Sequence, residues 1–358
     1  MGNGYSTTTH VDFTLFDVKR CGLYKKWDEP PLALSVKELI EQIKKWGIIS
    51  QKPLIETSVY SNEKILLPAY LWGVEECPIT GNSIIALWNE IENHKGAINY
   101  VSGSKPVGTG TIDATKAKAG QIPGFMSIFW VIPSRNIIVA INTEDHSSLG
   151  IIQLRKYLNG FLNGFSEQII RTSAENGEHT AFTLQQRNLN SPTDARIPDS
   201  KLKSSIQIQP LKLKGEIKFI KSNVVSVRKL IRKVRVRINH KEEYWHGIKD
   251  KIGFLFHSNE PTDNREIKIE YPTTINAKDV DFFVKQYIDN SYSNAYDVTF
   301  VFTGDIPNKS LSGIKAEEKF PGLKIKYSTD NTPVLLELLT ELNANFLSKV
   351  DGMLSKRA

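Results

Sequence analysis

The chain has 358 residues, with 46 Lys and Arg against 39 Asp and Glu, a net charge of +7. Its apolar fraction of 40% and charged fraction of 24% are those of a globular protein, and no run approaches the roughly 18 apolar residues that a membrane span needs. Two cysteines exclude a disulfide framework or a Cys-based zinc site, and the first residues lack the layout of a secretory signal, so we expect a cytoplasmic protein.

The first half of the predicted N-terminal domain alternates strands and helices. Residues 11–18 predict a strand, and the capping box Ser35-Val-Lys-Glu38 opens a helix that ends at Gly47. Residues 54–60 and 64–72 then predict a pair of strands. A second helix is expected from Asn82 or Ser83, with an apolar face between residues 84 and 91.

A β-hairpin is the strongest local pattern in the chain. Two apolar runs, 125–132 and 137–141, are separated by the turn-forming residues Pro133-Ser-Arg-Asn136. Both runs are apolar throughout, which favours a central place in the sheet. A helix over 148–165 follows, with an apolar stripe at helical spacing.

A polar stretch divides the chain into a predicted N-terminal domain (1–173), a linker or long loop (174–200) and a basic second domain (201–358). The second domain is expected to open with strands and then a basic helix from Ser222 that gives way to a strand near 233–238. Further on, the patterns predict strand 266–271, helix 276–288 and strand 298–303. A long helix begins at Thr332-Pro333.

These elements predict an α+β fold of two mixed domains, with mainly antiparallel sheets and a long C-terminal helix. The apolar stripe of that helix, running to Leu354, can pack on its own domain or pair with a second copy of the chain. A homodimer through this helix is therefore expected.

The positive charge is concentrated in one region. Residues 201–240 hold twelve basic residues and the single acid Glu216, so this stretch carries +11 and the rest of the chain −4. Such asymmetry is typical of a protein that binds a polyanion. The alternative is a solvated face without a partner.

We predict that these basic residues contact the phosphates of DNA and do not read its sequence. The main contacts are expected from Arg228, Lys229, Arg232, Lys233, Arg235 and Arg237, extended by Lys212, Lys214 and Lys218, with Lys116 and Lys118 from the Gly-rich loop 103–124.

Motifs for catalysis are scarce, and we expect no catalytic residue, metal or cofactor. Cys77 follows two glutamates, which predicts a raised thiol pKa and an unreactive thiol. Glu266-Ile-Lys268, with Asp263 before it, leaves a metal-dependent nuclease open as one alternative. An assembly protein that meets an acidic partner or a membrane surface is the other.

The step Gln121-Ile-Pro-Gly-Phe125 into the apolar run Ser127-Ile-Phe-Trp-Val131 resembles the Rex-type phage-exclusion proteins of temperate phages. The order of elements resembles theirs as well, although this chain is longer. The resemblance implies sequence-nonspecific DNA binding, a dimer, a membrane-protein partner encoded nearby, and a role in antiphage defence by abortive infection. It assigns no individual functional residue.

Overall fold

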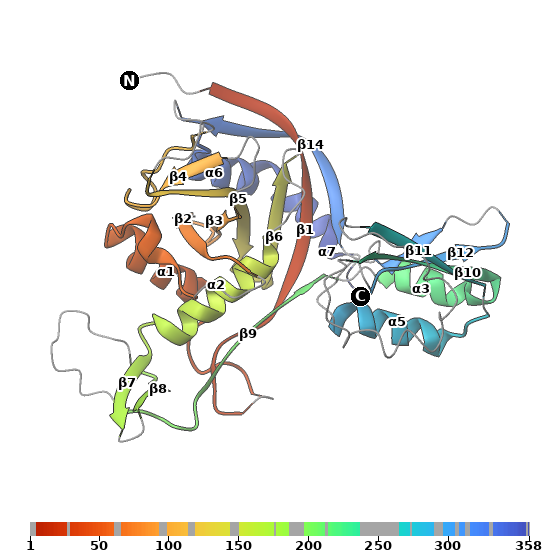
Figure 1. Ribbon diagram of the computed structural model, residues 1–358, viewed down its shortest axis with the longest axis horizontal. Coiled ribbons are helices and arrows are strands. Elements are labelled where there is room, and N and C mark those ends of the chain that lie inside the picture. Colours follow the sequence, from red (N-terminus) through yellow and green to blue (C-terminus); the bar gives the residue numbers. More distant parts are fainter. Residues whose placement is uncertain are drawn as a thin grey trace, which may run out of the picture. The chain divides into compact units, whose positions relative to one another are not determined.

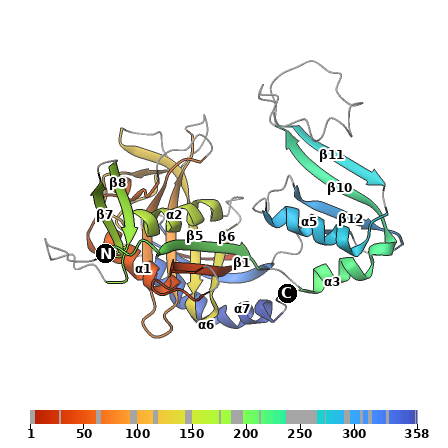
Figure 2. The same ribbon diagram turned by 90° about the horizontal axis from the view of Figure 1, so that it is seen from below.

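A computed structural model gives the fold of the chain (Figures 1 and 2). It describes residues 5–26, 29–60, 66–92, 99–113, 119–143, 150–174, 177–185, 197–211, 214–236, 265–272, 274–289, 296–304, 308–311, 316–328, 332–355 and 357. The chain forms two compact units. Unit 1 comprises Met1–Leu211 and Ala316–Arg357, and unit 2 comprises Lys212–Lys315. Helices lie beside sheets whose described strand pairings are all antiparallel, so the protein is α+β.

Unit 1 is built on an eight-stranded antiparallel sheet with the strand order β14-β1-β6-β5-β3-β2, in which β4 also pairs with β5 and β9 with β1. A separate hairpin is formed by β7 (Ile169–Ala174) and β8 (Gly177–Phe182). The strands of the large sheet are β1 (Tyr5–Tyr24), β2 (Ala69–Glu76), β3 (Ser83–Glu90), β4 (Asn99–Ser102), β5 (Gln121–Ile132), β6 (Ile137–Thr143), β9 (Lys203–Pro210) and β14 (Glu317–Tyr327).

Strand β1 has 20 residues and three partners (Figure 1). Along one edge it pairs first with β14, over residues 5–14, and then with β9, over residues 16–24. Along the other edge, residues 11–17 pair with β6. Register shifts interrupt the pairing at residues 9–11 and 18–20, which lets one long strand bend while keeping its neighbours.

Unit 2 is inserted into unit 1 where β9 and β14 meet. The Leu211 N–H donates to the Leu15 oxygen at 2.8 Å, and the Leu15 N–H donates to the Ala316 oxygen at 2.9 Å. The Ala316 N–H in turn donates to the Leu211 oxygen at 2.9 Å. The chain therefore leaves and re-enters unit 1 at a single point on β1.

Helices cover both faces of the large sheet. On one face, α1 (Val36–Lys44) and α2 (Ile151–Gly164) pack into the largest apolar cluster with the sheet residues Phe129 and Val131. On the other, α6 (Leu335–Asn345) and α7 (Leu347–Leu354) lie over Phe13, whose ring is 5.5 Å from that of Phe346. The central strand β3 is buried almost throughout and is correspondingly apolar, as covering both faces of a strand requires.

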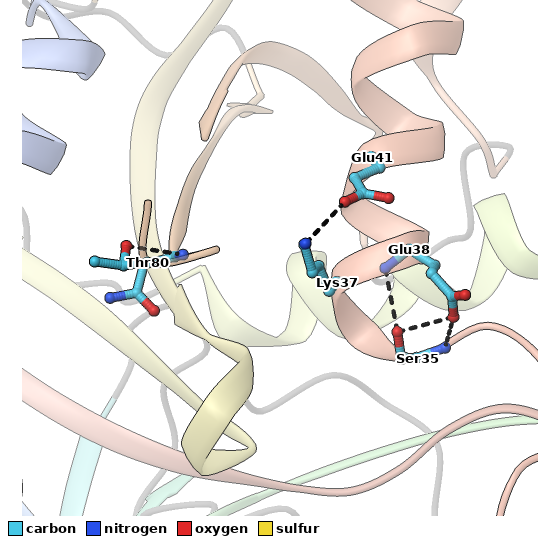
Figure 3. A network of polar contacts seen from close by, with 6 residues as sticks. Ser35, Lys37, Glu38, Glu41 and Thr80 are labelled. Carbon is cyan, nitrogen blue, oxygen red and sulfur yellow. Dashed lines mark hydrogen bonds and ion pairs between the residues drawn. The ribbon is translucent and has the colours of Figure 1, made fainter. Parts of the chain in front are cut away.

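The predicted first helix is confirmed together with its capping box (Figure 3). The Ser35 N–H donates to Glu38 Oε2 at 2.7 Å, and the Glu38 N–H donates to Ser35 Oγ at 3.3 Å. Lys37 and Glu41 form an ion pair of 3.5 Å on the same helix. The helix continues into a π-helical turn, Lys45–Ile49, and a 3₁₀ turn follows at Leu54–Thr57.

The predicted hairpin is also confirmed, as β5 and β6. A 3₁₀ turn, Pro133–Arg135, joins them, and Asn136 has the left-handed conformation at φ 52° that ends such a turn. Helix α2 falls within the range predicted for it. In the expected linker, residues 177–182 form β8, and 186–196 lie outside the described residues.

The described residues of unit 2 form a smaller sheet with helices α3 and α5 on one face. The strand order is β11-β10-β12-β13. Its elements are α3 (Lys214–Ser222), a 3₁₀ turn (Val224–Ser226), β10 (Val227–Val236), β11 (Arg265–Pro272), α5 (Ala277–Asp289), β12 (Val298–Phe302) and β13 (Lys309–Ser310). Leu230 and Phe300 of the sheet form an apolar core with Ile220 of α3 and with Val280 and Tyr287 of α5.

The predicted long C-terminal helix is wrong in length and in place. It is divided at Phe346 into α6 and α7, and both belong to unit 1, not to the second domain of 201–358. Its apolar stripe, with Leu338, Leu342 and Val350, is buried. The side chains that suggested a dimer through this helix therefore already have a place within unit 1, because they cover the second face of the sheet.

Several local expectations differ from the structure because short apolar runs do not separate helix from strand. The expected helix after Ser83 is β3, which is almost entirely buried. The segment near 216–220, expected as a strand, lies in α3, and the expected basic helix after Ser222 is strand β10. Residues 54–60 do not pair with a strand at 64–72, since β2 begins at Ala69 and pairs with β3.

The junction at Leu15 predicts that unit 1 folds without unit 2. We expect a chain in which residues 212–315 are replaced by a turn of about four residues to unfold cooperatively, because Leu211 and Ala316 already form a hydrogen-bonded pair that a short turn can close. Near-ultraviolet circular dichroism checks the packing of Trp88 and Trp130, both in the core. Loss of that signal with retained helix content would contradict the prediction.

Candidate nucleic-acid interface

The net charge of the chain resides in unit 2. Residues 212–315 contain 19 of the 46 Lys and Arg and 13 of the 39 Asp and Glu, so this unit carries +6 of the total +7. Unit 1 is close to neutral. The charge asymmetry seen along the sequence is therefore also an asymmetry between the two folded units.

Strand β10 holds five of the six main predicted contact residues. Its sequence, VRKLIRKVRV, alternates well enough for a strand that buries one face. Val227 and Leu230 are buried in the core beside the helices. Arg228 is an extra residue between two that pair with neighbouring positions of β12, and this bulge leaves its side chain exposed.

The basic residues of β10 are not equivalent. Lys229 Nζ lies 2.7 Å from Glu270 Oε2 of β11, with the two side chains 30% and 38% exposed. Arg232 instead lies on the same strand face as Leu230, with its guanidinium carbon 4.9 Å from the centre of the Tyr296 ring. One strand thus directs its cations to different environments, which their spacing in the sequence did not indicate.

Opposing acids lower the effective charge of the interface. Within the described residues, Glu270 pairs with Lys229, and Asp281 of α5 lies 2.6 Å from Lys221 of α3. Both acids come from outside residues 201–240, so a count within that stretch missed them. Glu270 could have been identified only from the pairing of β10 with β11. In that pairing Glu270 stands opposite Ile231 and diagonal to Lys229.

Among the other predicted contact residues, the structure describes the side-chain exposure of Lys218 alone. Lys233 stands opposite Lys268 in the β10–β11 pairing, and Arg235 stands opposite Glu266. Lys214 begins α3, and Lys218 on the same helix is exposed. Lys212, Arg237, Lys116 and Lys118 lie outside the described residues.

No group of three or more His, Cys, Asp and Glu is placed to hold a metal among the described residues. Glu266 and Lys268, the residues behind the nuclease alternative, are placed on β11 by their backbone alone, and Asp263 lies outside the described residues. No helix in the described ranges combines the length and apolarity needed to cross a bilayer.

The pKa of the Cys77 thiol is lowered, whereas the sequence predicted that it would be raised. A hydrogen bond with the Thr80 side chain, and further bonds with the Thr80 and Ile79 backbone, lower the pKa of the Cys77 thiol and outweigh the neighbouring Glu76, which raises it. Burial raises the pKa of Cys21 to about 12. The flanking acids were thus a poor guide, because hydrogen bonds to the sulfur act at shorter range.

Comparison with known protein families, with characterised proteins and with solved structures found no match for this chain.

The thiol environments predict selective alkylation. At pH 8 we expect iodoacetamide to modify Cys77 of the native protein rapidly and Cys21 only after unfolding, because the thiolate is the reactive form and Cys21 is buried. Peptide mass spectrometry over time locates the label, and a Cys77→Ser variant serves as the control. Equal labelling rates at the two positions would contradict this assignment.

Proposed function

We propose that unit 2 binds DNA through its phosphate backbone, without reading the base sequence through the groove edges. The observation that carries the proposal is that residues 212–315 hold +6 of the net +7, with the basic residues concentrated on strand β10 and helix α3. A strand that carries several cations can contact successive phosphates of a nucleic-acid backbone, and each contact releases condensed counterions.

The contact residues follow from the described environments. Arg228 and Lys218 are exposed, and no acid is placed beside either in the described ranges, so they are the best phosphate contacts. Lys229 is held by Glu270 and has to exchange that partner for a phosphate. Lys233 and Arg235 lie further along the same strand.

The biological role that we propose is a sensor or effector of antiphage defence by abortive infection, with binding and no catalysis. This part rests on the resemblance of Gln121–Phe125 and the hairpin after it to the Rex-type phage-exclusion proteins. A homodimer and a membrane-protein partner are implied by the same resemblance, and both remain predictions.

Charge reversal at the exposed cations is expected to weaken binding. At about 0.1 M salt, Arg228→Glu or Lys218→Glu should each cost at least about tenfold in affinity for a random-sequence duplex. Each should also reduce the slope of log affinity against log salt by about 1. Fluorescence anisotropy measures both quantities.

The matched control for these variants is Lys324→Glu, which makes the same charge change at an exposed position on β14 of unit 1. If Lys324→Glu weakens binding as much as Arg228→Glu, net charge alone determines affinity and unit 2 is not the binding surface. If the unaltered protein does not bind DNA at physiological salt, the proposal fails, and an acidic protein partner becomes the better explanation of the charge.

Removing the acid that holds Lys229 is expected to have the opposite effect. Glu270→Gln should raise the affinity about two- to fivefold, the range set by partly exposed ion pairs. Glu56→Gln, at an exposed position of unit 1, is the control and should change nothing. A loss of affinity in Glu270→Gln would show that Glu270 positions Lys229 for its ligand rather than competing with it.

A further inference from the structure

Unit 2 contains a cavity of about 470 Å³ between its sheet and the start of α5. Leu230 and Arg232 of β10 and Tyr271 of β11 form the sheet side, while Asp279 and Phe283 of α5 form the helix side. The volume lies within the range of small-molecule binding sites, and the lining combines apolar and aromatic walls with a few polar groups.

The two charged groups of the cavity are held in place by contacts within unit 2. The Arg232 guanidinium lies over the Tyr296 ring at 4.9 Å, an arrangement that restricts a long side chain to one region. The Asp279 carboxylate accepts the Asn276 N–H through Oδ2 at 2.8 Å, while Asn276 Oδ1 accepts the Lys278 and Asp279 N–H groups at 2.8 and 3.2 Å. This reciprocal cap fixes the carboxylate against the cavity wall.

A nucleobase is the ligand that suits this combination. Its flat ring fits between aromatic and apolar side chains such as Phe283 and Leu230. An arginine guanidinium is planar and stacks on such rings, which a lysine ammonium does not do. A carboxylate accepts hydrogen bonds from the exocyclic amino group of cytosine or adenine, and thymine has no such group.

We propose that this cavity takes up one unstacked base of a bound strand, with a preference for bases that carry an exocyclic amino group. The proposal rests on the proposed function, because Arg232 and Leu230 belong to the same strand as the phosphate contacts. In this assignment Arg232 is a base contact rather than a phosphate contact. Unit 2 then favours single-stranded DNA, in which a base reaches the cavity without breaking a pair.

Three ligands of equal length test the proposal with the full-length protein: oligo-dC, oligo-dT and a mixed-sequence duplex. Anisotropy is expected to give oligo-dC an affinity about tenfold above that of oligo-dT and of the duplex. Deoxycytidine monophosphate at millimolar concentration should remove that advantage by competing for the cavity, which would show that a free nucleotide is accepted as well.

Two variants separate the cavity from the phosphate contacts. Arg232→Lys keeps the charge but loses the planar group that stacks on a base, so it should lower the affinity for both single strands while leaving duplex affinity and its salt slope unchanged. The control Arg228→Lys lies at the exposed bulge and should keep the affinity for both single strands. Asp279→Asn should equalise oligo-dC and oligo-dT, and circular dichroism confirms that α5 remains folded.

The outcomes distinguish the two proposals. Equal affinity for the three ligands, all sensitive to Arg228→Glu, would overturn the base-binding cavity and leave phosphate binding intact. Absence of binding to all three would overturn the proposed function as well. An oligo-dC advantage over oligo-dT that persists in Asp279→Asn would place base recognition outside this cavity.

Discussion

The architecture of the protein depends on the way β1 shares its edges. One 20-residue strand pairs with β6 on one side and with β14 and then β9 on the other, so segments from the start, middle and end of the chain join one sheet. The change of partner occurs at Leu15, where Leu211 and Ala316 are hydrogen-bonded to β1 and to each other. The two ends of the insertion, Leu211 and Ala316, are joined by a hydrogen bond. A short connection between them would therefore cost little loop-closure entropy.

Local signals predicted the parts of the fold that local interactions determine. The capping box at Ser35 and the turn ending at Asn136 are short-range arrangements, and both were readable from the sequence. Strand β3 was misread as a helix because helices cover both faces of its sheet, so its polar–apolar alternation is absent. The place of α6 and α7 on unit 1 depends on contacts with Phe13 and Phe320, which lie elsewhere in the sequence.

The candidate site shows the same division between local and long-range information. The sequence shows that cations are dense near β10, but it does not show which neighbour each cation contacts. Glu270 lies 41 residues after Lys229 and meets it only through the β10–β11 pairing. Arg232 is three residues from Lys229, yet it lines a cavity and its guanidinium lies over the Tyr296 ring. A charge count adds neighbours along the chain, whereas binding depends on neighbours in space.

The motif behind the family resemblance has a packing role in unit 1. A Cβ atom added at Gly124 would lie 2.3 Å from the Asn89 oxygen and 2.6 Å from Trp88 Nε1, so only glycine fits where β5 passes β3. The Trp88 indole N–H donates to the Ile122 oxygen at 3.2 Å within the same step. Any chain with this hairpin packing needs such a glycine, whatever it binds. The resemblance therefore concerns unit 1 and the charge concerns unit 2, so the proposed defence role and the proposed DNA binding are argued from different parts of the chain.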